Sequence, residues 1–212
     1  MRIVLVGGAK GGTGKTTVAT ALAAHRARAG RDVAIVDTDQ QASAAFWVAL
    51  RAETEAPPIA CVQLQGKAIA NQIRDLATRY DEIIVDAGGR DSVELRAAMT
   101  VAERLVTPIQ ASQFDTWTVE AMSRLVEQAQ GFNPELDALV CINRASPNPR
   151  VAEADEAQEL ISEYDTLRLA STIIRDRIAH RRAVRDGQSA EEHGEDTKAA
   201  QEIRDLANEV YA

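Results

Sequence analysis

Two lysines stand five positions apart in a glycine-rich stretch close to the start of the sequence. The stretch reads GGAKGGTGKTT over residues 7–17, and its two cations are Lys10 and Lys15. Glycines let backbone N–H groups turn towards phosphate oxygens, and a helix that begins at such a loop adds its positive dipole end. Lys15 is placed to reach the β- and γ-phosphates, and the Thr16 hydroxyl is placed to bind Mg²⁺. The spacing therefore predicts a phosphate-binding loop.

Carboxylates follow two apolar runs further along the chain. IVDTDQQ at 35–41 contains Asp37 and Asp39, and EIIVDAGG at 82–89 contains Asp86. Carboxylates beside a bound phosphate hold Mg²⁺, directly or through water, and position the attacking water. The alternative for the first pair is that they only cap the helix that follows the strand.

These residues need a scaffold of strands and helices in alternation. Apolar runs typical of strands occupy residues 2–6, 32–37, 59–64, 82–86, 104–109 and 137–143. Helical spacing of apolar residues is found at 16–30, 69–79, 117–130 and 152–163. Because the strand-like runs lack polar alternation, they indicate parallel strands covered by helices on both faces. The sequence thus predicts an α/β fold with a mostly parallel, twisted sheet, in a single domain spanning residues 1–212.

Composition limits the class of protein. No apolar run is long enough to span a bilayer and no export signal is recognisable at the start, so the sequence predicts a cytoplasmic protein. Cys61 and Cys141 have no second cysteine or histidine at ligand spacing, which predicts two reduced, buried thiols. The net charge of −8 disfavours a surface that is basic all over, so any binding of nucleic acid must come from a local patch.

The string from Lys10 to Thr17 resembles the signature K-G-G-x-G-K-T-[ST] of the ParA/MinD group of P-loop ATPases, the deviant Walker A family. The resemblance implies a P-loop NTPase fold, ATP hydrolysis, and ATP and Mg²⁺ as cofactors. It implies that the nucleotide is bound by Lys10, Gly11, Gly12, Thr13, Gly14, Lys15, Thr16 and Thr17. It also gives Lys10 a role, because in this family the first lysine crosses a dimer interface to the partner subunit's phosphates. The alternative for Lys10 is a solvated loop charge.

The resemblance assigns further roles. It implies three catalytic residues, Lys10, Lys15 and Asp39, of which the last positions the hydrolytic water. It implies three residues that hold or support Mg²⁺: Thr16, Asp37 and Asp86. Asn143 and Arg144, from CINRA at the end of a later strand, would border the adenine. Two positions depart from the family pattern, since Ala9 stands where glycine is usual and Gln40 where proline is common.

Arginines gather between residues 168 and 185, a segment whose acid is Asp176. The arginines are Arg168, Arg175, Arg177, Arg181, Arg182 and Arg185. Such a density predicts weak, sequence-independent and salt-sensitive binding of DNA phosphates. The alternative is an arginine-rich helix face that pairs with neighbouring acids.

The resemblance and the arginine density together imply a small DNA-partition ATPase associated with the nucleoid. In this hypothesis Mg-ATP drives a sandwich homodimer, the dimer binds nonspecific DNA, and a centromere-binding, ParB-like partner stimulates hydrolysis. Two alternatives stay open: an ATPase that positions a protein cargo or a membrane site, as MinD does, and a P-loop biosynthetic synthetase. Residues 191–212 carry seven acids against Lys198 and Arg204, which argues against membrane attachment through a basic terminal helix.

Overall fold

The computed structural model describes residues 2–89, 91–110, 116–147, 153–194 and 196–212. The described strands form one seven-stranded sheet in the order β3-β2-β4-β1-β5-β6-β7, and every neighbouring pair is parallel. The strands are β1 Arg2–Val6, β2 Val33–Asp37, β3 Ala60–Gln63, β4 Glu82–Asp86, β5 Arg104–Ile109, β6 Asp137–Ala145 and β7 Arg168–Arg175. Because all strands run the same way, their carboxyl ends meet at one end of the sheet.

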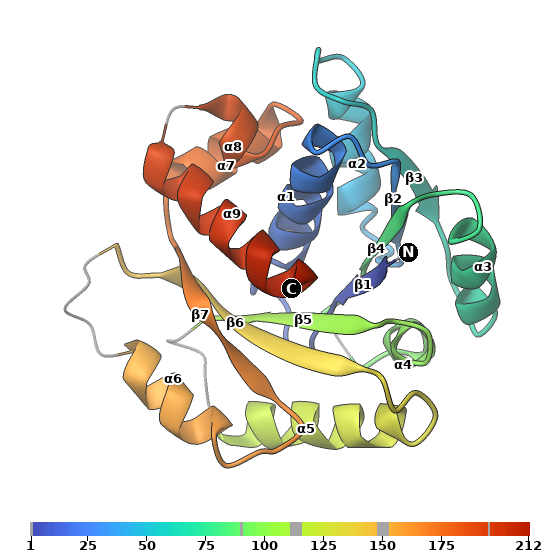
Figure 1. Cartoon of the computed structure of the whole chain (residues 1–212), viewed down its shortest axis with the longest axis vertical. Coiled ribbons are helices and arrows are strands. Elements are labelled where there is room, and N and C mark those ends of the chain that lie inside the picture. The colour runs from blue at the N-terminus through green and yellow to red at the C-terminus, as the bar shows by residue number, and fades with distance from the viewer. Residues whose placement is uncertain (1, 90, 111–115, 148–152, 195) are drawn as a thin grey trace.

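Helices cover both faces of the sheet (Figure 1). Their bounds are α1 Lys15–Arg28, α2 Ser43–Arg51, α3 Ile69–Leu76, α4 Val93–Met99, α5 Thr116–Gln130, α6 Glu153–Ile161, α7 Ile178–Arg185, α8 Ala190–His193 and α9 Thr197–Tyr211. Helices α3 to α6 pack on one face, and α1, α2 and α9 pack on the other. The predicted α/β class with helices on both faces of a parallel sheet is confirmed.

Alternation along the strands builds two cores, one on each face. Ile3 and Leu5 of β1 belong to the core under α3 to α6, whereas Val4 and Val6 belong to the core under α1, α2 and α9. All four side chains are at most 8% exposed. Each such side chain contributes roughly 1.5–3 kcal/mol of burial free energy. A strand buried on both faces is rigid, and the loops at its end start from fixed points.

The predicted elements match the structure closely in the first two thirds of the chain. The strand predicted at 137–143 continues to Ala145, and the helix predicted at 69–79 ends at Leu76. Ala152, the first residue of another predicted helix, lies outside the described residues, and α6 is described from Glu153. The residue pattern did not predict α2, α4 or the helices after β7. Helices α2, α4, α7 and α8 have nine residues or fewer, whereas α9 has 15 residues and an apolar face containing Ile203, Leu206 and Val210, a pattern that does predict a helix.

Two glutamates of α9 close the β7 edge of the sheet. The Glu209 carboxylate accepts the backbone N–H groups of Ser171 and Thr172 at 2.8 and 2.7 Å. The Glu202 carboxylate accepts the backbone N–H of Arg175 at 3.1 Å. The two glutamates are seven positions apart, which puts them on the same face of the helix. Helix α9 therefore occupies backbone donors that an edge strand would otherwise expose.

Candidate functional site

The phosphate-binding loop lies between β1 and α1, as predicted. Gly12 and Gly14 have φ values of 78° and 90°, in the left-handed region that favours glycine. A Cβ atom at Gly14 would lie 2.3 Å from Nδ2 of Asn143, so this position also lacks room for a side chain. A Cβ atom at Gly89 would lie 2.6 Å from Cα of Gly11, because the loop after β4 touches the phosphate-binding loop. Glycine is required at these contacts.

Lys15 is the first residue of α1 and is 7% exposed. Its Nζ donates to the backbone carbonyl of Lys10 at 2.6 Å, so the side chain folds back over the loop. Burial lowers the pKa of Lys15, while the charges of Asp86 and Asp39 act in the opposite direction. The ammonium group thus lies among carboxylates at the centre of the loop.

Asp86 ends β4 and is 1% exposed. Neither of its carboxylate oxygens has a hydrogen-bond partner among the described residues. Burial raises the pKa of Asp86 to about 7; the nearby Thr16 hydroxyl, outside hydrogen-bond geometry, and the Lys15 charge lower it, whereas the charges of Asp37 and Asp39 raise it. A buried carboxylate without a donor is costly unless a cation or a donor from a ligand completes it.

Asp37 lies beside Asp86 in the sheet register but has a different environment. Its two carboxylate oxygens accept the backbone N–H groups of Asp39 and Ala45, at 3.1 and 2.9 Å, and Ala45 belongs to the first turn of α2. Asp37 therefore makes the contacts of a helix cap, which was the alternative to a role in binding Mg²⁺. Asp39 accepts the N–H of Gln41 at 3.0 Å, and its Oδ2 would be 3.4 Å from a Cβ atom at Gly88. Asp39 thus faces the glycines that follow β4.

The residues around Asp86 fit a Mg²⁺ ion. In the part of the chain that the structure describes, no three Asp, Glu, His or Cys side chains form a metal cage. Mg²⁺ does not need one, since it keeps several waters and takes one or two protein ligands together with phosphate oxygens. The buried, donor-free carboxylate of Asp86 and the Thr16 hydroxyl beside it provide such a donor set.

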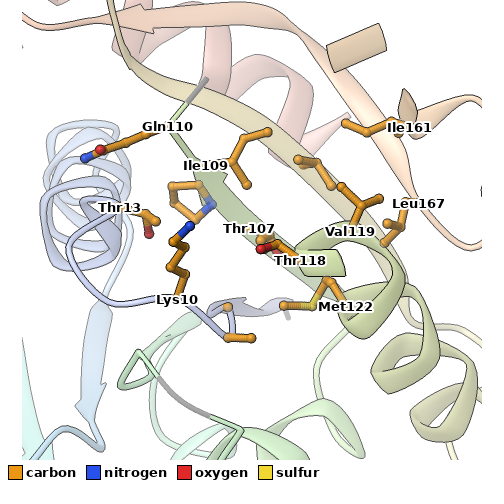
Figure 2. A pocket seen from close by; sticks show the side chains of 14 residues that line it. Lys10, Thr13, Thr107, Ile109, Gln110, Thr118, Val119, Met122, Ile161 and Leu167 are labelled. Atoms are coloured by element: carbon orange, nitrogen blue, oxygen red, sulfur yellow. The ribbon is translucent and has the colours of Figure 1, made fainter. Parts of the chain in front are cut away.

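Lys10 lines a cavity of about 30 Å³ between the phosphate-binding loop and α5. Figure 2 shows its side chain directed towards the end of β5, between Thr13 and Thr107. The other walls are mainly apolar and come from β5, β6, α5 and α6. The Thr107 hydroxyl is buried and has no hydrogen-bond partner among the described residues. In the free chain, Lys10 therefore lies along its own subunit.

Asn143 and Arg144 contact the phosphate-binding loop itself. Nδ2 of Asn143 donates to the carbonyl of Thr13 at 2.7 Å, and Nη1 of Arg144 donates to the carbonyl of Gly12 at 3.2 Å. Both residues also line a recess of about 290 Å³ beside the N-terminus of α1. A recess in this position can accommodate the base of a nucleotide whose phosphates lie in the loop. Nε2 of Gln110, a residue that the sequence reasoning missed, donates to the same Gly12 carbonyl at 2.9 Å.

The structure does not bring the six arginines onto one surface. Arg168 begins β7 at the amino end of the sheet and pairs with Asp137 at 2.9 Å, whereas α7 lies beyond the carboxyl end. Arg177 is paired with Glu202 at 2.7 Å, and its side chain is 18% exposed. Arginines that line the recess or its rim are Arg144, Arg175, Arg177 and Arg181.

One exposed basic face remains, on α7. It comprises Arg181, Arg182 and Arg185. Arg185 is four positions after Arg181 and three after Arg182, so both are its neighbours on the helix surface. Arg181 pairs with Asp176 and Arg185 with Asp186, but these side chains are 61% and 75% exposed, so water screens both pairs. We refer to these three arginines as the α7 basic face.

Three acids of the C-terminal segment do not form a negative surface. The carboxylates of Glu191, Glu192 and Glu202 are at most 14% exposed and pair with arginines. The sequence-based argument that a negative tail repels a bilayer therefore does not hold for these groups. Among the described residues, no helix combines the length and apolarity that crossing a membrane requires.

The two cysteines are free thiols. Cys141 is buried, as predicted, but Cys61 is only partly buried because β3 is an edge strand. Burial raises the pKa of each thiol to about 12. A thiol whose pKa is raised this far is protonated at neutral pH.

Comparison with known proteins decides the family. The family model described as the CobQ/CobB/MinD/ParA nucleotide binding domain matches residues 4–190. The chain belongs to this family. The assignment confirms the predicted resemblance to the ParA/MinD group and extends from β1 to the first residue of α8.

Relatives of the chain are named for different functions. The chain is 32% identical over 190 residues to the maintenance of carboxysome distribution protein A of Gloeobacter kilaueensis, covering 89% of this chain and 83% of the relative. It is 28% identical over 243 residues to the chromosome-partitioning ATPase Soj of Thermus thermophilus, covering 100% and 96%. A solved structure of the septum site-determining protein MinD from Pyrococcus horikoshii, complexed with Mg-ADP, has a TM-score of 0.76 at 20% identity, covering 99% and 95%. The last likeness shows that the fold is shared.

Proposed function

We propose that the chain is an ATP-hydrolysing partition ATPase of this family, acting as a single domain over residues 1–212. The observation that carries the proposal is the buried, donor-free carboxylate of Asp86, beside Thr16 and Lys15 at the phosphate-binding loop. Among the described residues, no group donates a hydrogen bond to this carboxylate. A Mg-nucleotide supplies the missing cation and gives the three residues a common ligand.

The proposed division of work follows the geometry. Lys15 exchanges the Lys10 carbonyl for phosphate oxygens, and the inward N–H groups of the loop hold the phosphates. Asp39, at the glycines after β4, orients the attacking water. Asp86 and Thr16 hold Mg²⁺, with Asp37 ordering the start of α2 behind them. When bound, the ion neutralises charge on the phosphate oxygens.

Lys10 supplies a second cation, and we propose that it does so across a homodimer. Its side chain lies beside the loop of its own subunit, on the wall of the 30 Å³ cavity, so a change of rotamer is required (Figure 2). Positive charge delivered to the transferring phosphoryl group is worth roughly 10³-fold or more in rate. Hydrolysis would then depend on pairing of two nucleotide-loaded chains.

Sedimentation tests this step directly. Wild-type protein with a non-hydrolysable ATP analogue should sediment as a dimer, and Lys10→Ala should remain a monomer under the same conditions. Lys67→Ala is a matched control, since Lys67 is an exposed lysine between β3 and α3. A Lys10→Ala protein that dimerises as the wild type does would contradict the proposed role of this lysine.

We further propose that the dimer attaches to nonspecific DNA, and hence to the nucleoid in the cytoplasm, through the α7 basic face. Two copies of three exposed arginines support weak, salt-sensitive binding. Filter binding with ATP, with ADP and with the Arg181→Ala/Arg182→Ala variant tests it; equal retention of DNA in all three cases would defeat it.

A centromere-binding, ParB-like protein is the proposed stimulator of hydrolysis.

A second candidate is an ATPase that distributes a protein cargo. The relative from G. kilaueensis is named for carboxysome distribution, and its 32% identity exceeds the 28% of Soj. Both functions use the same ATPase. Co-purification from the native cell after cross-linking separates them, because the first predicts a DNA-binding partner and the second a cargo adaptor.

A further inference from the structure

Two side chains from neighbouring strands converge on one carbonyl of the phosphate-binding loop. Nε2 of Gln110, directly after β5, and Nη1 of Arg144, in β6, both donate to the Gly12 carbonyl, at 2.9 and 3.2 Å. In Figure 2, Gln110 leaves the end of β5 towards the loop. Asn143 holds the next carbonyl, that of Thr13. The residues joined by each of these hydrogen bonds are more than 90 positions apart in the sequence.

Arg144 makes its contact from a strained backbone. Its φ of 56° lies in the left-handed region, and only Ala42 shares this property among the described non-glycine residues. That region is unfavourable for a residue with a Cβ atom, and it persists only where the surroundings enforce it. Arg144 is exposed and contributes nothing to the apolar cores, and its left-handed φ coincides with a shift of the β6–β7 register between Ile142 and Ala145. Such a bulge re-aims a side chain, and here the side chain contacts the Gly12 carbonyl.

The direction of the Gly12 carbonyl matters for phosphate binding. A loop that cradles phosphate must point its N–H groups inward, and therefore its carbonyls outward. Gly12 has a φ of 78° and open space around its Cα, so its peptide group is free to rotate unless something holds it. Donors outside the loop favour the outward carbonyl and reduce the entropy lost when phosphate binds.

We propose that Gln110 and Arg144 are positioning residues that hold the Gly12 peptide in the phosphate-binding orientation. The proposal rests on the proposed nucleotide binding and deepens it. Arg144 also lines the 290 Å³ recess, so it connects the place of the base to the place of the phosphates, whereas Gln110 does not line that recess. We therefore expect Arg144 to affect binding of both the base and the phosphates, and Gln110 to affect binding of the phosphates alone.

Equilibrium titration with a fluorescent (mant) ATP analogue tests the proposal. Gln110→Leu and Arg144→Gly should each weaken binding by about fivefold, as expected for loss of one exposed hydrogen bond. The turnover number of Gln110→Leu at saturating Mg-ATP should stay within about twofold of the wild type, since Gln110 touches no reacting atoms. Gln110→Glu, which keeps the size but replaces the donor with a negative charge facing the Gly12 carbonyl, should weaken binding more than Gln110→Leu does. Arg124→Ala is the control, because Arg124 is an exposed arginine of α5, paired with Glu120.

Thermal unfolding separates positioning from general support of the fold. Arg144→Gly relieves the left-handed strain and should raise Tm by about 2 °C while it weakens nucleotide binding. If Arg144 were merely structural, Arg144→Gly would lower Tm and leave the affinity of the folded protein for the nucleotide unchanged. Competition with inorganic tripolyphosphate should show equal losses for tripolyphosphate and ATP in Gln110→Leu, and a larger loss for ATP in Arg144→Gly.

The outcomes are distinguishable from failure of the proposed function. If the wild-type protein does not bind the ATP analogue, the proposed nucleotide binding and the proposed positioning role are both wrong. Wild-type binding with unchanged affinity in both variants would overturn the positioning role alone. Lower Tm and lower turnover in Arg144→Gly, with affinity unchanged, would make Arg144 a structural residue and also overturn it.

Discussion

The two ends of β4 carry acids that differ in how the fold treats them. Glu82 opens the strand at 5% exposure, and Asp86 closes it at 1%. Glu82 receives the Arg26 guanidinium, whose Nε lies 2.8 Å from both carboxylate oxygens. Asp86 receives no hydrogen bond from the described residues. The amino end of this strand is completed by the protein, and the carboxyl end is left for a ligand.

The same contrast holds across the sheet. At the amino end, Asp137 is shared by Arg104 and Arg168, at 3.1 and 2.9 Å. At the carboxyl end, the cation among the carboxylates is Lys15, which donates to a backbone carbonyl. Acids that form ion pairs within the chain are thus interpreted as structural, and a buried acid without a hydrogen-bond donor is interpreted as part of the site. Three predictions test this distinction.

The largest effect is expected from Asp86→Asn. Loss of the carboxylate that supports Mg²⁺ should reduce Mg-ATP turnover by roughly 10³-fold, since the metal contributes several kcal/mol to the transition state. Phosphate release at saturating Mg-ATP measures it. Glu82→Gln, the same chemical change at the other end of the strand, is the matched control and should leave turnover of the folded protein close to wild type. Similar losses of turnover in both variants would contradict the distinction between a ligand-binding acid and a structural acid.

Glu82→Gln should instead destabilise the fold, by about 3 kcal/mol, because it leaves Arg26 without its buried partner. Urea unfolding measures the change, with an unchanged slope as evidence that the transition is still two-state. The double variant Glu82→Met/Arg26→Met should recover much of the loss, since a buried pair can be replaced by apolar side chains. A single variant as stable as the wild type would show that Glu82 needs no partner.

The third effect is a pH dependence, on the order of 2 kcal/mol. Burial raises the pKa of Asp86 to about 7, above the 3.8 of an unperturbed aspartate. Between these values the folded chain holds a proton that the unfolded chain has released, so the free energy of unfolding falls as pH rises from about 4 to 7. Urea unfolding of nucleotide-free, metal-free protein at pH 5 and pH 8 measures it. Asp86→Asn should remove this part of the slope, and an identical slope in both proteins would contradict the assignment.

The sequence predicts the positions of the candidate site residues in the fold well where local pattern decides. The phosphate-binding loop, Asp37 and Asp86 lie where predicted because each depends on a strand that ends and a loop or helix that begins within a few residues. Parallel pairing then brings β1, β2 and β4 together, since the buried runs leave few other arrangements.

Prediction fails where partners are distant in sequence. Arg177 lies in an arginine-rich segment, yet its partner Glu202 is 25 residues away on α9. Gln110 has no local signal, and its target Gly12 lies 98 residues before it. The acids of the C-terminal segment form a negative run in the sequence, but in the fold the carboxylates of Glu191 and Glu192 are buried against side chains from α1 and α2. Charge density along a chain does not equal charge density on a surface.

The closed edge of β7 limits how copies of this chain can assemble. A strand added there would have to displace Glu202 and Glu209 from the backbone of β7. The opposite edge, β3, has side chains that are only partly buried. Filament growth by continuation of the sheet would therefore be one-sided and self-terminating, and any extended polymer of this protein must be built through helices and loops.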